Sequence, residues 1–238
     1  MSDERAVRIG VAFARQASGT PASRLCSACV EILDVSGAGV TIMSGFNSGP
    51  VCSSDERMGR LEDLQFSLGE GPCRDAYDTR RPVNEPDLEH RSPDRWPHYT
   101  RSALEMGARG VFAFPITIGT GRIGVLTLYQ DSAGPLTVSQ TADSVVVADV
   151  LAQTIVSIQA RSATPVLARE LSDAGAYRAE VHQASGMLSV QLGVGVDEAL
   201  ARIRAHAYAT NQSAASVAQQ VVARTLRLGG DRSTEGQE

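Results

Sequence analysis

The sequence predicts an α+β domain followed by an all-α domain of three helices. Two apolar runs, 111–118 and 122–130, are separated by the turn residues Gly119-Thr120-Gly121, as in a β-hairpin. Helical patterns lie on both sides of the strand patterns, and after Pro165 only helical patterns remain. These observations predict a sheet-containing domain that ends near residue 160 and a separate helical domain after it.

The elements of the first domain each have a sequence signal. Thr20-Pro21 has the residue types of a helix start, and Gly37 has that of a helix end. The run Val40-Thr41-Ile42-Met43 indicates a strand, and Gly69-Glu70-Gly71-Pro72 indicates a turn, because glycine adopts backbone angles that other residues avoid. We expect helices at 3–18, 21–35, 73–78 and 137–160, and a short helix or loop at 55–66. Strands are expected at 40–43, near 51–52 and from 82, and a loop around one short helical stretch at 84–99.

The second domain shows three segments with apolar residues at helical spacing. They cover 176–192, 197–209 and 213–227, with breaks at Gly193-Val194-Gly195 and Thr210-Asn211. The predicted division of the chain is an N-terminal helix at 1–19, the α+β domain at 20–160, a linker at 161–175, the three-helix domain at 176–228 and a disordered tail at 229–238.

The composition excludes several classes of function. The chain has 238 residues, a net charge of −5 and 22 basic residues, all of which are Arg. A lysine amine or a lysine-bearing phosphate loop is therefore impossible, and the acidic balance disfavours a general nucleic-acid binder. Residues 176–228 differ from the rest in net charge, because they contain five Arg and only three acidic residues. The charged N-terminal residues and the lack of an apolar run of about 20 residues predict a cytoplasmic protein with no membrane partner.

The four cysteines allow more than one interpretation. Cys26 and Cys29 form a C-x-x-C, a spacing found in redox and zinc sites. Both also lie on the apolar stripe of the helix expected at 21–35, where a buried cysteine acts as a small hydrophobe. We favour the second interpretation, because the sequence has no second C-x-x-C and no closely spaced histidine pair to complete a zinc site.

The first domain contains an ordered set of short motifs, namely Phe66-Ser67-Leu68-Gly69-Glu70-Gly71-Pro72-Cys73, Arg81-Pro82-Val83, Asp87-Leu88, Trp96-Pro97, Gly107, Phe114-Pro115 and Ile123-Gly124-Val125-Leu126-Thr127-Leu128. In order and spacing this set resembles the bacterial GAF domain over residues 20–160. The resemblance implies a nearly six-stranded antiparallel sheet with helices on one side and a pocket on the other. Such pockets hold cyclic nucleotides, haem, other tetrapyrroles or small metabolites, or have no known ligand.

The pocket walls implied by this resemblance come from alternate residues of the two strand runs and from the helix after the turn. The candidates are Thr41, Met43, Cys73, Phe112 and Phe114. A haem would need an axial histidine, and this domain offers only His90 and His98, in a polar loop where we expect them to be solvated. A bilin would need a cysteine, for which Cys73 is a candidate. We therefore expect a small-molecule signal, with no certain cofactor and no metal.

The second domain contains three further motifs, namely Tyr177-Arg178-Ala179-Glu180-Val181-His182-Gln183-Ala184-Ser185-Gly186-Met187-Leu188, Asp197-Glu198-Ala199-Leu200-Ala201-Arg202-Ile203-Arg204 and Ser216-Val217-Ala218-Gln219-Gln220-Val221-Val222. Together they resemble the ANTAR domain, a three-helix RNA-binding module of bacterial antitermination regulators. The resemblance implies that the domain recognises paired stem-loops in nascent transcripts and so controls terminator formation.

One position departs from the ANTAR pattern. The family usually has Lys or Arg between an alanine and a glycine of the first helix, and this chain has Ser185 between Ala184 and Gly186. A serine hydroxyl can bind a phosphate but carries no charge, so a contact there would contribute less to RNA affinity and to its salt dependence.

Arg204 and Tyr208 lie four residues apart on one helical face, where they could offer a guanidinium and a stacking ring to unpaired bases. In the alternative interpretation Tyr208 packs in the three-helix core and Arg204 is merely solvated. The candidate RNA-binding residues are Arg178, Ala184, Ser185, Gly186, Arg204, Tyr208 and Asn211.

The long helix at 137–160 has apolar residues at a 3-4-3 spacing, namely Ala148, Leu151, Ile155 and Ile158. This spacing suits a short coiled-coil seam, and it equally suits packing of the helix on its own sheet. The GAF resemblance implies dimers through terminal helices, and two RNA loops would need two ANTAR modules. We therefore expect a homodimer.

The sequence as a whole predicts a cytoplasmic, signal-responsive transcription regulator that binds structured RNA and is not an enzyme. Three alternatives stay open. They are a DNA-binding regulator, a GAF-type thiol enzyme that reduces methionine sulfoxide with Cys52 and Cys73, and a protein-interaction module that has lost RNA binding.

Overall fold

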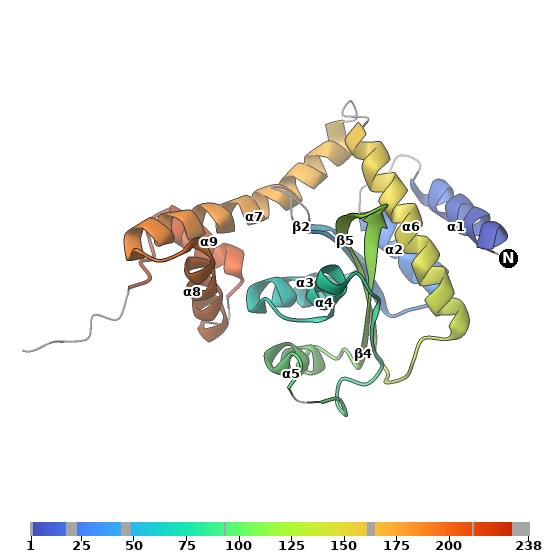
Figure 1. Ribbon diagram of the computed structural model, residues 1–238, viewed down its shortest axis with the longest axis horizontal. Coiled ribbons are helices and arrows are strands. Elements are labelled where there is room, and N and C mark those ends of the chain that lie inside the picture. Colours follow the sequence, from blue (N-terminus) through green and yellow to red (C-terminus); the bar gives the residue numbers. More distant parts are fainter. Residues whose placement is uncertain are drawn as a thin grey trace, which may run out of the picture. The chain divides into compact units, whose positions relative to one another are not determined.

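The computed structural model describes residues 2–17, 23–43, 49–92, 94–160, 165–210 and 212–229. The chain divides into two compact units, Met1–Ala176 and Tyr177–Glu238. Figure 1 shows that the first unit is built around a sheet and that the second consists of helices.

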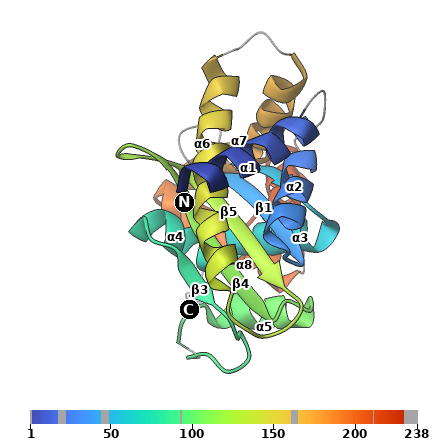
Figure 2. The same ribbon diagram turned by 90° about the vertical axis from the view of Figure 1, so that its right-hand side faces the viewer.

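The first unit contains an antiparallel sheet with helices on both faces (Figure 2). Its strands are β1 (Gly37–Ile42), β2 (Gly49–Ser53), β3 (Val83–Glu85), β4 (Gly110–Ile118) and β5 (Gly121–Gln130). In the described residues the strand order is β2-β1-β5-β4-β3. The helices of this unit are α1 (Ser2–Ala17), α2 (Ser23–Leu33), α3 (Glu56–Leu68), α4 (Pro72–Thr79), α5 (Pro97–Glu105) and α6 (Val138–Ala160).

The β4–β5 hairpin is the one that the sequence predicts, and β1 pairs with the other edge of β5. At Gly124 of β5 the backbone of β1 comes very close, since a Cβ there would lie 2.1 Å from the carbonyl oxygen of Thr41. Only glycine fits such an approach. This glycine therefore allows β1 and β5 to pack closely at this point of the sheet.

Successive side chains of a strand point to opposite faces, and the two faces of this sheet have different cores. On one face, Phe112, Phe114 and Leu126 pack with residues of α1, α2 and α6. On the other face, Val111 and Ala113 pack with residues of α3, α4 and α5. The GAF resemblance implied helices on one side and nearly six strands. The five strands of the described residues are close to that number, whereas helices cover both faces and not one.

Helix α6 belongs to the first of these cores. Ala148, Leu151 and Ile155 are buried there, so the spacing that suited a coiled-coil seam instead packs the helix on its own sheet. Helix α1 is held against α6 by two ion pairs, in which Arg5 and Arg8 approach the nearly buried carboxylate of Asp143 at 2.7 and 3.0 Å. The Ile158 side chain lies outside the described residues.

The helical part comprises α7 (Pro165–Leu192), α8 (Val196–Ala209) and α9 (Ala214–Val222). Its core consists mainly of small and β-branched side chains, namely Val181, Ala184, Leu188, Ala199, Ile203, Ala207, Ala214, Ala215, Val217, Ala218 and Val221. Ser213 caps α9, because its hydroxyl accepts a hydrogen bond from the Ser216 amide at 3.1 Å.

Several predicted boundaries differ from the structure. Residues 165–175, expected as linker, are the first part of α7. Helix α9 ends at Val222 rather than near 227, because the chain turns at Arg224, which has a left-handed φ of 60°. The short helical stretch expected within 84–99 begins only at Pro97, where α5 starts, and it continues to Glu105. Residues 230–238, expected as a tail, lie outside the described residues. Among the helices that are described, none is long and apolar enough to cross a membrane.

Candidate functional site

The sheet face beneath α3, α4 and α5 holds an unusual set of buried polar side chains. We call Thr41, Glu62, Gln65, Tyr99 and Thr127 the polar cluster; each is more than nine-tenths buried. In the described residues, the hydroxyl oxygens of the two threonines and of Tyr99 have no hydrogen-bond partner, and neither does Nε2 of Gln65. Burying such a group without a partner costs about 1–3 kcal/mol, so the cluster calls for a functional explanation.

The sheet and α3 bring part of the cluster together. Thr127 of β5 lies opposite Gly39 of β1, and Thr41 follows two residues later on the same face. Glu62 reaches this point from α3, because a Cβ on Gly39 would lie 3.2 Å from the Glu62 Oε1 atom. A carboxylate and two hydroxyls therefore share one small area of the sheet.

The Gly69–Pro72 turn places Gln65 at the start of α4. Oε1 of Gln65 accepts a hydrogen bond from the Cys73 amide at 2.7 Å, which leaves its Nε2 group free to donate. Gly71 has a φ of 133°, and a Cβ there would lie 2.6 Å from Gln65 Oε1. Glycine is therefore required both by the backbone angle and by the close approach of the glutamine.

Tyr99 comes from the first turn of α5. Burial raises the pKa of its hydroxyl above the ordinary value, and the nearby Glu62 and Cys73 act in the same direction. The hydroxyl therefore stays protonated at neutral pH. Glu70 fixes the start of this helix, because its Oε1 accepts hydrogen bonds from the amides of His98 and Tyr99, both at 2.9 Å.

The structure brings together three of the five predicted pocket residues. Thr41 belongs to the polar cluster, and the Sγ atom of Cys73 lies 3.7 Å from the Sδ atom of Met43 on the same side of the sheet. Phe112 and Phe114 are buried on the opposite face with α1, α2 and α6, so they do not line a site with the other three. Sequence reasoning missed Glu62, Gln65, Tyr99 and Thr127.

Cys26 and Cys29 are both buried in the core, as the favoured interpretation of the sequence expects, and the structure adds a disulfide that the sequence did not indicate. Cys26 forms a disulfide with Cys52, while Cys29 is a buried free thiol. Burial raises the pKa of Cys29 to about 12, so this thiol is neutral. Cys52 and Cys73, the pair that a thiol enzyme would use, belong to the cores on opposite faces of the sheet.

The two histidines of this unit, His90 and His98, are both exposed. Nδ1 of His90 lies 2.9 Å from Asp87 Oδ2, and this hydrogen bond is the main reason that the pKa of Asp87 is lowered. In the part of the chain that the structure describes, no three His, Cys, Asp or Glu side chains gather where they could hold a metal ion.

In the helical unit, two of the predicted RNA-binding residues are internal. Ala184 and Ser185 are both 0% exposed. The Ser185 hydroxyl donates a hydrogen bond of 2.7 Å to the Val181 carbonyl oxygen, one turn earlier in α7. Ser185 therefore serves the packing of the three helices and has no surface to offer a phosphate. Gly186 next to it is half-buried, and a Cβ there would meet no atom within 4 Å.

The outer surface of α8 has two distinct flanks. With a rotation of about 100° per residue, Arg204 and Tyr208 lie on one side of the buried Ile203, and Glu198 and Arg202 lie on the other. Tyr208 is 47% exposed and Arg204 is half-buried, whereas Arg202 forms an ion pair of 2.7 Å with Glu198. Tyr208 is therefore a surface residue and does not pack in the three-helix core, as the alternative interpretation had it.

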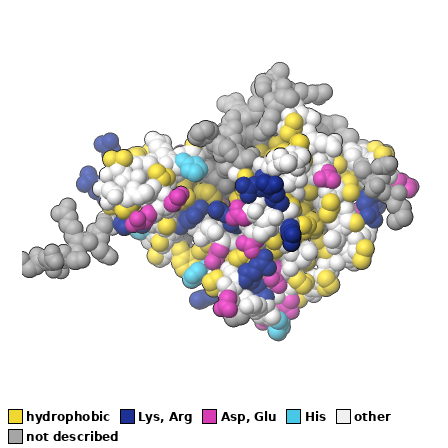
Figure 3. Space-filling view, viewed as in Figure 1, with side chains coloured by type: hydrophobic (Ala, Val, Ile, Leu, Met, Phe, Trp, Pro, Cys, Tyr) yellow, Lys and Arg dark blue, Asp and Glu magenta, His cyan; other side chains and the backbone are white. Residues whose placement is uncertain are grey.

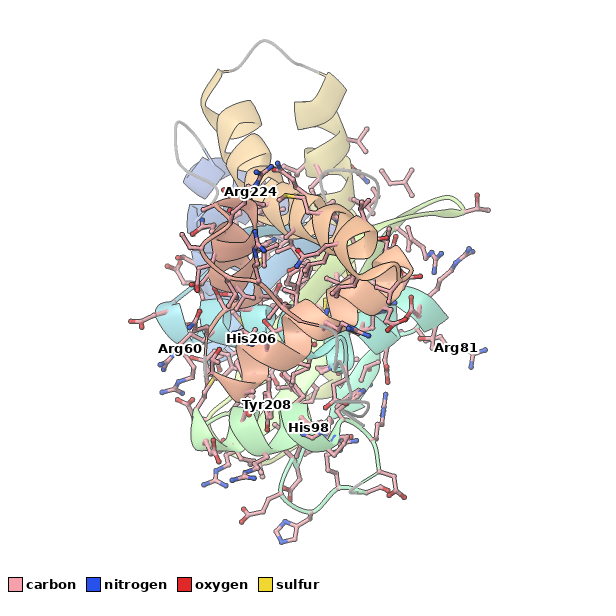
Figure 4. All side chains as sticks on the ribbon, turned by 90° about the vertical axis from the view of Figure 1, so that its left-hand side faces the viewer. Arg60, Arg81, His98, His206, Tyr208 and Arg224 are labelled. Carbon is pink, nitrogen blue, oxygen red and sulfur yellow. A yellow bond between two sulfur atoms is a disulfide. The ribbon has the colours of Figure 1, made fainter. Side chains whose placement is uncertain are left out.

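The remaining basic groups of this unit are spread over several elements. Figure 4 labels His206 and Tyr208 on α8 and Arg224 just beyond α9. Basic and acidic side chains are mixed over the face of the molecule drawn in Figure 3. The Arg178 side chain and all of Asn211 lie outside the described residues.

Comparisons with known proteins agree with this architecture. The family model of the GAF domain matches residues 22–158, more than half of the chain, and the model of the ANTAR domain matches residues 169–222. No curated protein sequence matches the chain.

Among solved structures, the chain is similar to the GAF domain of a phosphoenolpyruvate-protein phosphotransferase from Coxiella burnetii. The identity is 17%, the TM-score is 0.51, and the match covers 68% of this chain and 98% of that one. The corresponding GAF domain from Acinetobacter has 14% identity, a TM-score of 0.48 and coverages of 66% and 93%. A free methionine-R-sulfoxide reductase from Thermoplasma acidophilum has 16% identity, a TM-score of 0.41 and coverages of 56% and 90%. These likenesses concern the fold alone, and the two family models identify the chain as a member of the GAF domain family that carries a C-terminal ANTAR domain.

Proposed function

We propose that this protein is a signal-responsive transcription regulator, in which the GAF domain binds a small molecule and the ANTAR domain binds structured RNA. The observation that carries the proposal is the joint presence of both domains in one chain. A sensor domain joined to an RNA-binding domain would let a metabolite control whether a transcript terminates.

The polar cluster is the proposed contact surface for the signal molecule. Three buried hydroxyls and an amide N–H lack partners in the described residues, and a bound ligand would supply them. The Tyr99 hydroxyl stays protonated, so it can donate to a ligand oxygen or accept from a ligand N–H. The proposed ligand is therefore small and carries several hydrogen-bonding groups.

The flank of α8 that carries Arg204 and Tyr208 is the proposed contact surface for RNA. A half-exposed ring can stack on an unpaired base, and a guanidinium beside it can bind a phosphate or a base edge. Ala184 and Ser185 would act only by packing, because both are buried. Arg178, Gly186 and Asn211 stay proposed contacts on the strength of the ANTAR resemblance.

We further propose a cytoplasmic homodimer without catalytic activity. Two ANTAR domains would be needed to hold two RNA loops at once. The surface of the dimer would have to differ from the Ala148, Leu151 and Ile155 stripe, because these residues are already buried in the core of their own unit.

The test of RNA binding is a titration of the full chain against an RNA that carries two stem-loops. A scrambled hairpin and a DNA duplex of equal length are the controls. Two or three phosphate contacts in each of the two modules would make the affinity fall by roughly 100-fold or more between 50 and 200 mM salt. Equal affinity for all three nucleic acids would refute specific RNA recognition, and a preference for the duplex would favour the DNA-binding alternative.

The test of ligand binding is mass spectrometry of the small molecules released when the purified protein is denatured. We expect a compound that is absent when Thr41 and Thr127 are both changed to valine, because these variants keep the shape of the side chain and remove its hydroxyl. If the parent protein and the double variant release the same compound, the polar cluster is not where that compound binds.

A further inference from the structure

The disulfide joins the edge of the sheet to the helical layer on one of its faces. Cys26 lies in α2 and Cys52 lies in β2, which is an edge strand, and their Cα atoms are 5.9 Å apart. We propose that Cys26 and Cys52 form a reversible redox pair through which the GAF domain also responds to oxidants. The proposal rests on the proposed cytoplasmic function, since disulfides in a reducing compartment are usually transient and serve redox sensing.

The arrangement of the other two thiols isolates this pair. Cys29 lies three residues after Cys26 on the same helix and remains a free, buried thiol outside the disulfide. Cys73 lies in the core on the opposite face of the sheet. The structure pairs Cys26 with Cys52 and with neither of these two thiols, so the Cys26–Cys52 bond is the product expected when the domain is oxidised.

The two partners differ in their access to solvent. Cys26 is fully buried, whereas Cys52 retains 7% of its exposure and lies between the half-buried Val51 and Ser53 of the edge strand. Cys52 is therefore the residue that a small oxidant reaches first. Cys26 lies on the buried side of this pair, where its sulfur can form the disulfide with an oxidised Cys52.

A hydroperoxide is the class of oxidant that this geometry suits. The Cys52 thiolate attacks the O–O bond and becomes a sulfenic acid, and the peroxide leaves as an alcohol, or as water from hydrogen peroxide. The Cys26 sulfur then attacks the Cys52 sulfur and releases water, which forms the disulfide. Two thiols thus give two electrons and two protons to the peroxide, and a dithiol reductant returns both.

The bond ties α2 to the sheet, and α2 shares its core with α6. Leu33 of α2 packs in the same cluster as Val147 and Leu151 of α6. Helix α6 ends at Ala160, and the next helix along the chain, α7, continues into the ANTAR domain. Oxidation should therefore hold α2 against β2 and stiffen the layer that α6 belongs to, whereas reduction should release it.

The experiment follows thiol state and backbone opening in the full chain. The protein is equilibrated with mixtures of oxidised and reduced dithiothreitol, alkylated and analysed by peptide mass spectrometry, and its amide hydrogen exchange is measured in both states. We expect Cys26 and Cys52 to become alkylated together, hydrogen peroxide to restore the bond, and exchange in α2 and β2 to rise at least 3-fold on reduction.

Two serine variants provide the controls. Cys29→Ser should keep the whole response, whereas Cys52→Ser should exchange at the reduced rate under all conditions. Failure of peroxide to form the Cys26–Cys52 bond would overturn the proposal, as would equal exchange rates in the two states.

RNA affinity is measured separately in the same two states, so that the two proposals fail in different ways. A several-fold change in Kd that is absent in Cys52→Ser would support redox control of the regulator, and equal Kd values would overturn that control. Absence of RNA binding in both states would refute the proposed function, while alkylation and hydrogen exchange would still decide the redox pair.

Discussion

The interiors of the two domains differ in what their buried polar groups do. In the GAF domain, the hydroxyls of Thr41, Thr127 and Tyr99 are buried without a hydrogen-bond partner in the described residues. In the ANTAR domain, the buried Ser185 hydroxyl is bonded to its own helix. The first interior carries unmet hydrogen bonds that a ligand can fill, whereas the buried Ser185 hydroxyl of the second already has its partner. The RNA recognition that we propose for the ANTAR domain therefore uses its outer surface.

The largest loss of stability is expected from placing a charge in the interior of the ANTAR domain. Ser185→Arg restores the type of residue that the ANTAR family usually has, yet the position is 0% exposed. An unpaired charge there should cost about 3–5 kcal/mol, and amide hydrogen exchange in α8 and α9 should report the loss. Ser185→Ala should change stability by less than about 1 kcal/mol. Tighter RNA binding by a stably folded Ser185→Arg variant would contradict the burial of this side chain.

The next effect distinguishes the domains by their response to alkaline pH. Burial raises the pKa of Cys29 from 9.0 to about 12. Above pH 9 the unfolded thiol loses its proton and the folded one keeps it, so the unfolded state binds fewer protons. The free energy of unfolding of the GAF domain should then fall by about 1.4 kcal/mol per pH unit through this group, up to about pH 12.

Urea denaturation at pH 8 to 11 measures this slope. Cys29→Ala is the matched variant, because it removes the titrating thiol and leaves Tyr129, whose pKa is also raised to about 12 by burial and by Asp55. An unchanged slope in Cys29→Ala would show that other groups cause the alkaline loss of stability.

A smaller change in the free energy of unfolding, of opposite sign, is expected when the buried threonine hydroxyls without a hydrogen-bond partner are removed. Thr41→Val and Thr127→Val each replace a buried hydroxyl without a partner by a methyl group of similar size. Each should raise the free energy of unfolding of the ligand-free protein by roughly 1 kcal/mol, because a desolvation cost disappears. Thermal unfolding after removal of bound small molecules measures the change. A loss of more than about 1 kcal/mol would mean that these hydroxyls stabilise the fold.

Much of the fold can be read from the sequence because its signals are local. The β4–β5 hairpin follows from two apolar runs around a glycine-containing turn, and the long α6 from its spacing. The burial of Ser185 was also readable, since it lies on the stripe of Val181, Ala184 and Leu188. The ANTAR resemblance instead predicts an RNA contact at this residue, because the family usually has a basic side chain there. Pro97 indicates the start of α5, because proline is common at the first position of a helix, whereas the polar residues before it indicate a loop.

The candidate ligand site was harder to predict because it depends on strand register. Alternation alone does not say whether Phe112 or Ala113 shares a face with Thr41, and the pairing of β5 with both β1 and β4 decides this. The Cys26–Cys52 bond links two residues 26 positions apart, on a helix and on a strand, and the C-x-x-C spacing of Cys26 and Cys29 gives no indication of it. Such long-range contacts leave no periodic signal in the sequence.

The central claim is that the ANTAR domain reads RNA with one flank of its surface, and the two flanks of α8 allow a matched test. Tyr208→Ala removes an exposed ring, and Tyr208→Phe keeps it. Arg204→Ala and Arg202→Ala each remove one positive charge, from opposite flanks. Thermal unfolding of each variant confirms that the domain stays folded.

The decisive measurement is the Kd of these variants for the two-stem-loop RNA at one salt concentration. Loss of a stacked base should weaken binding by roughly 5- to 100-fold in Tyr208→Ala, with Tyr208→Phe close to the parent. Arg204→Ala should lose about 10-fold and Arg202→Ala less than about 3-fold. Equal losses in the two arginine variants, together with an unchanged Kd in Tyr208→Ala, would contradict the account.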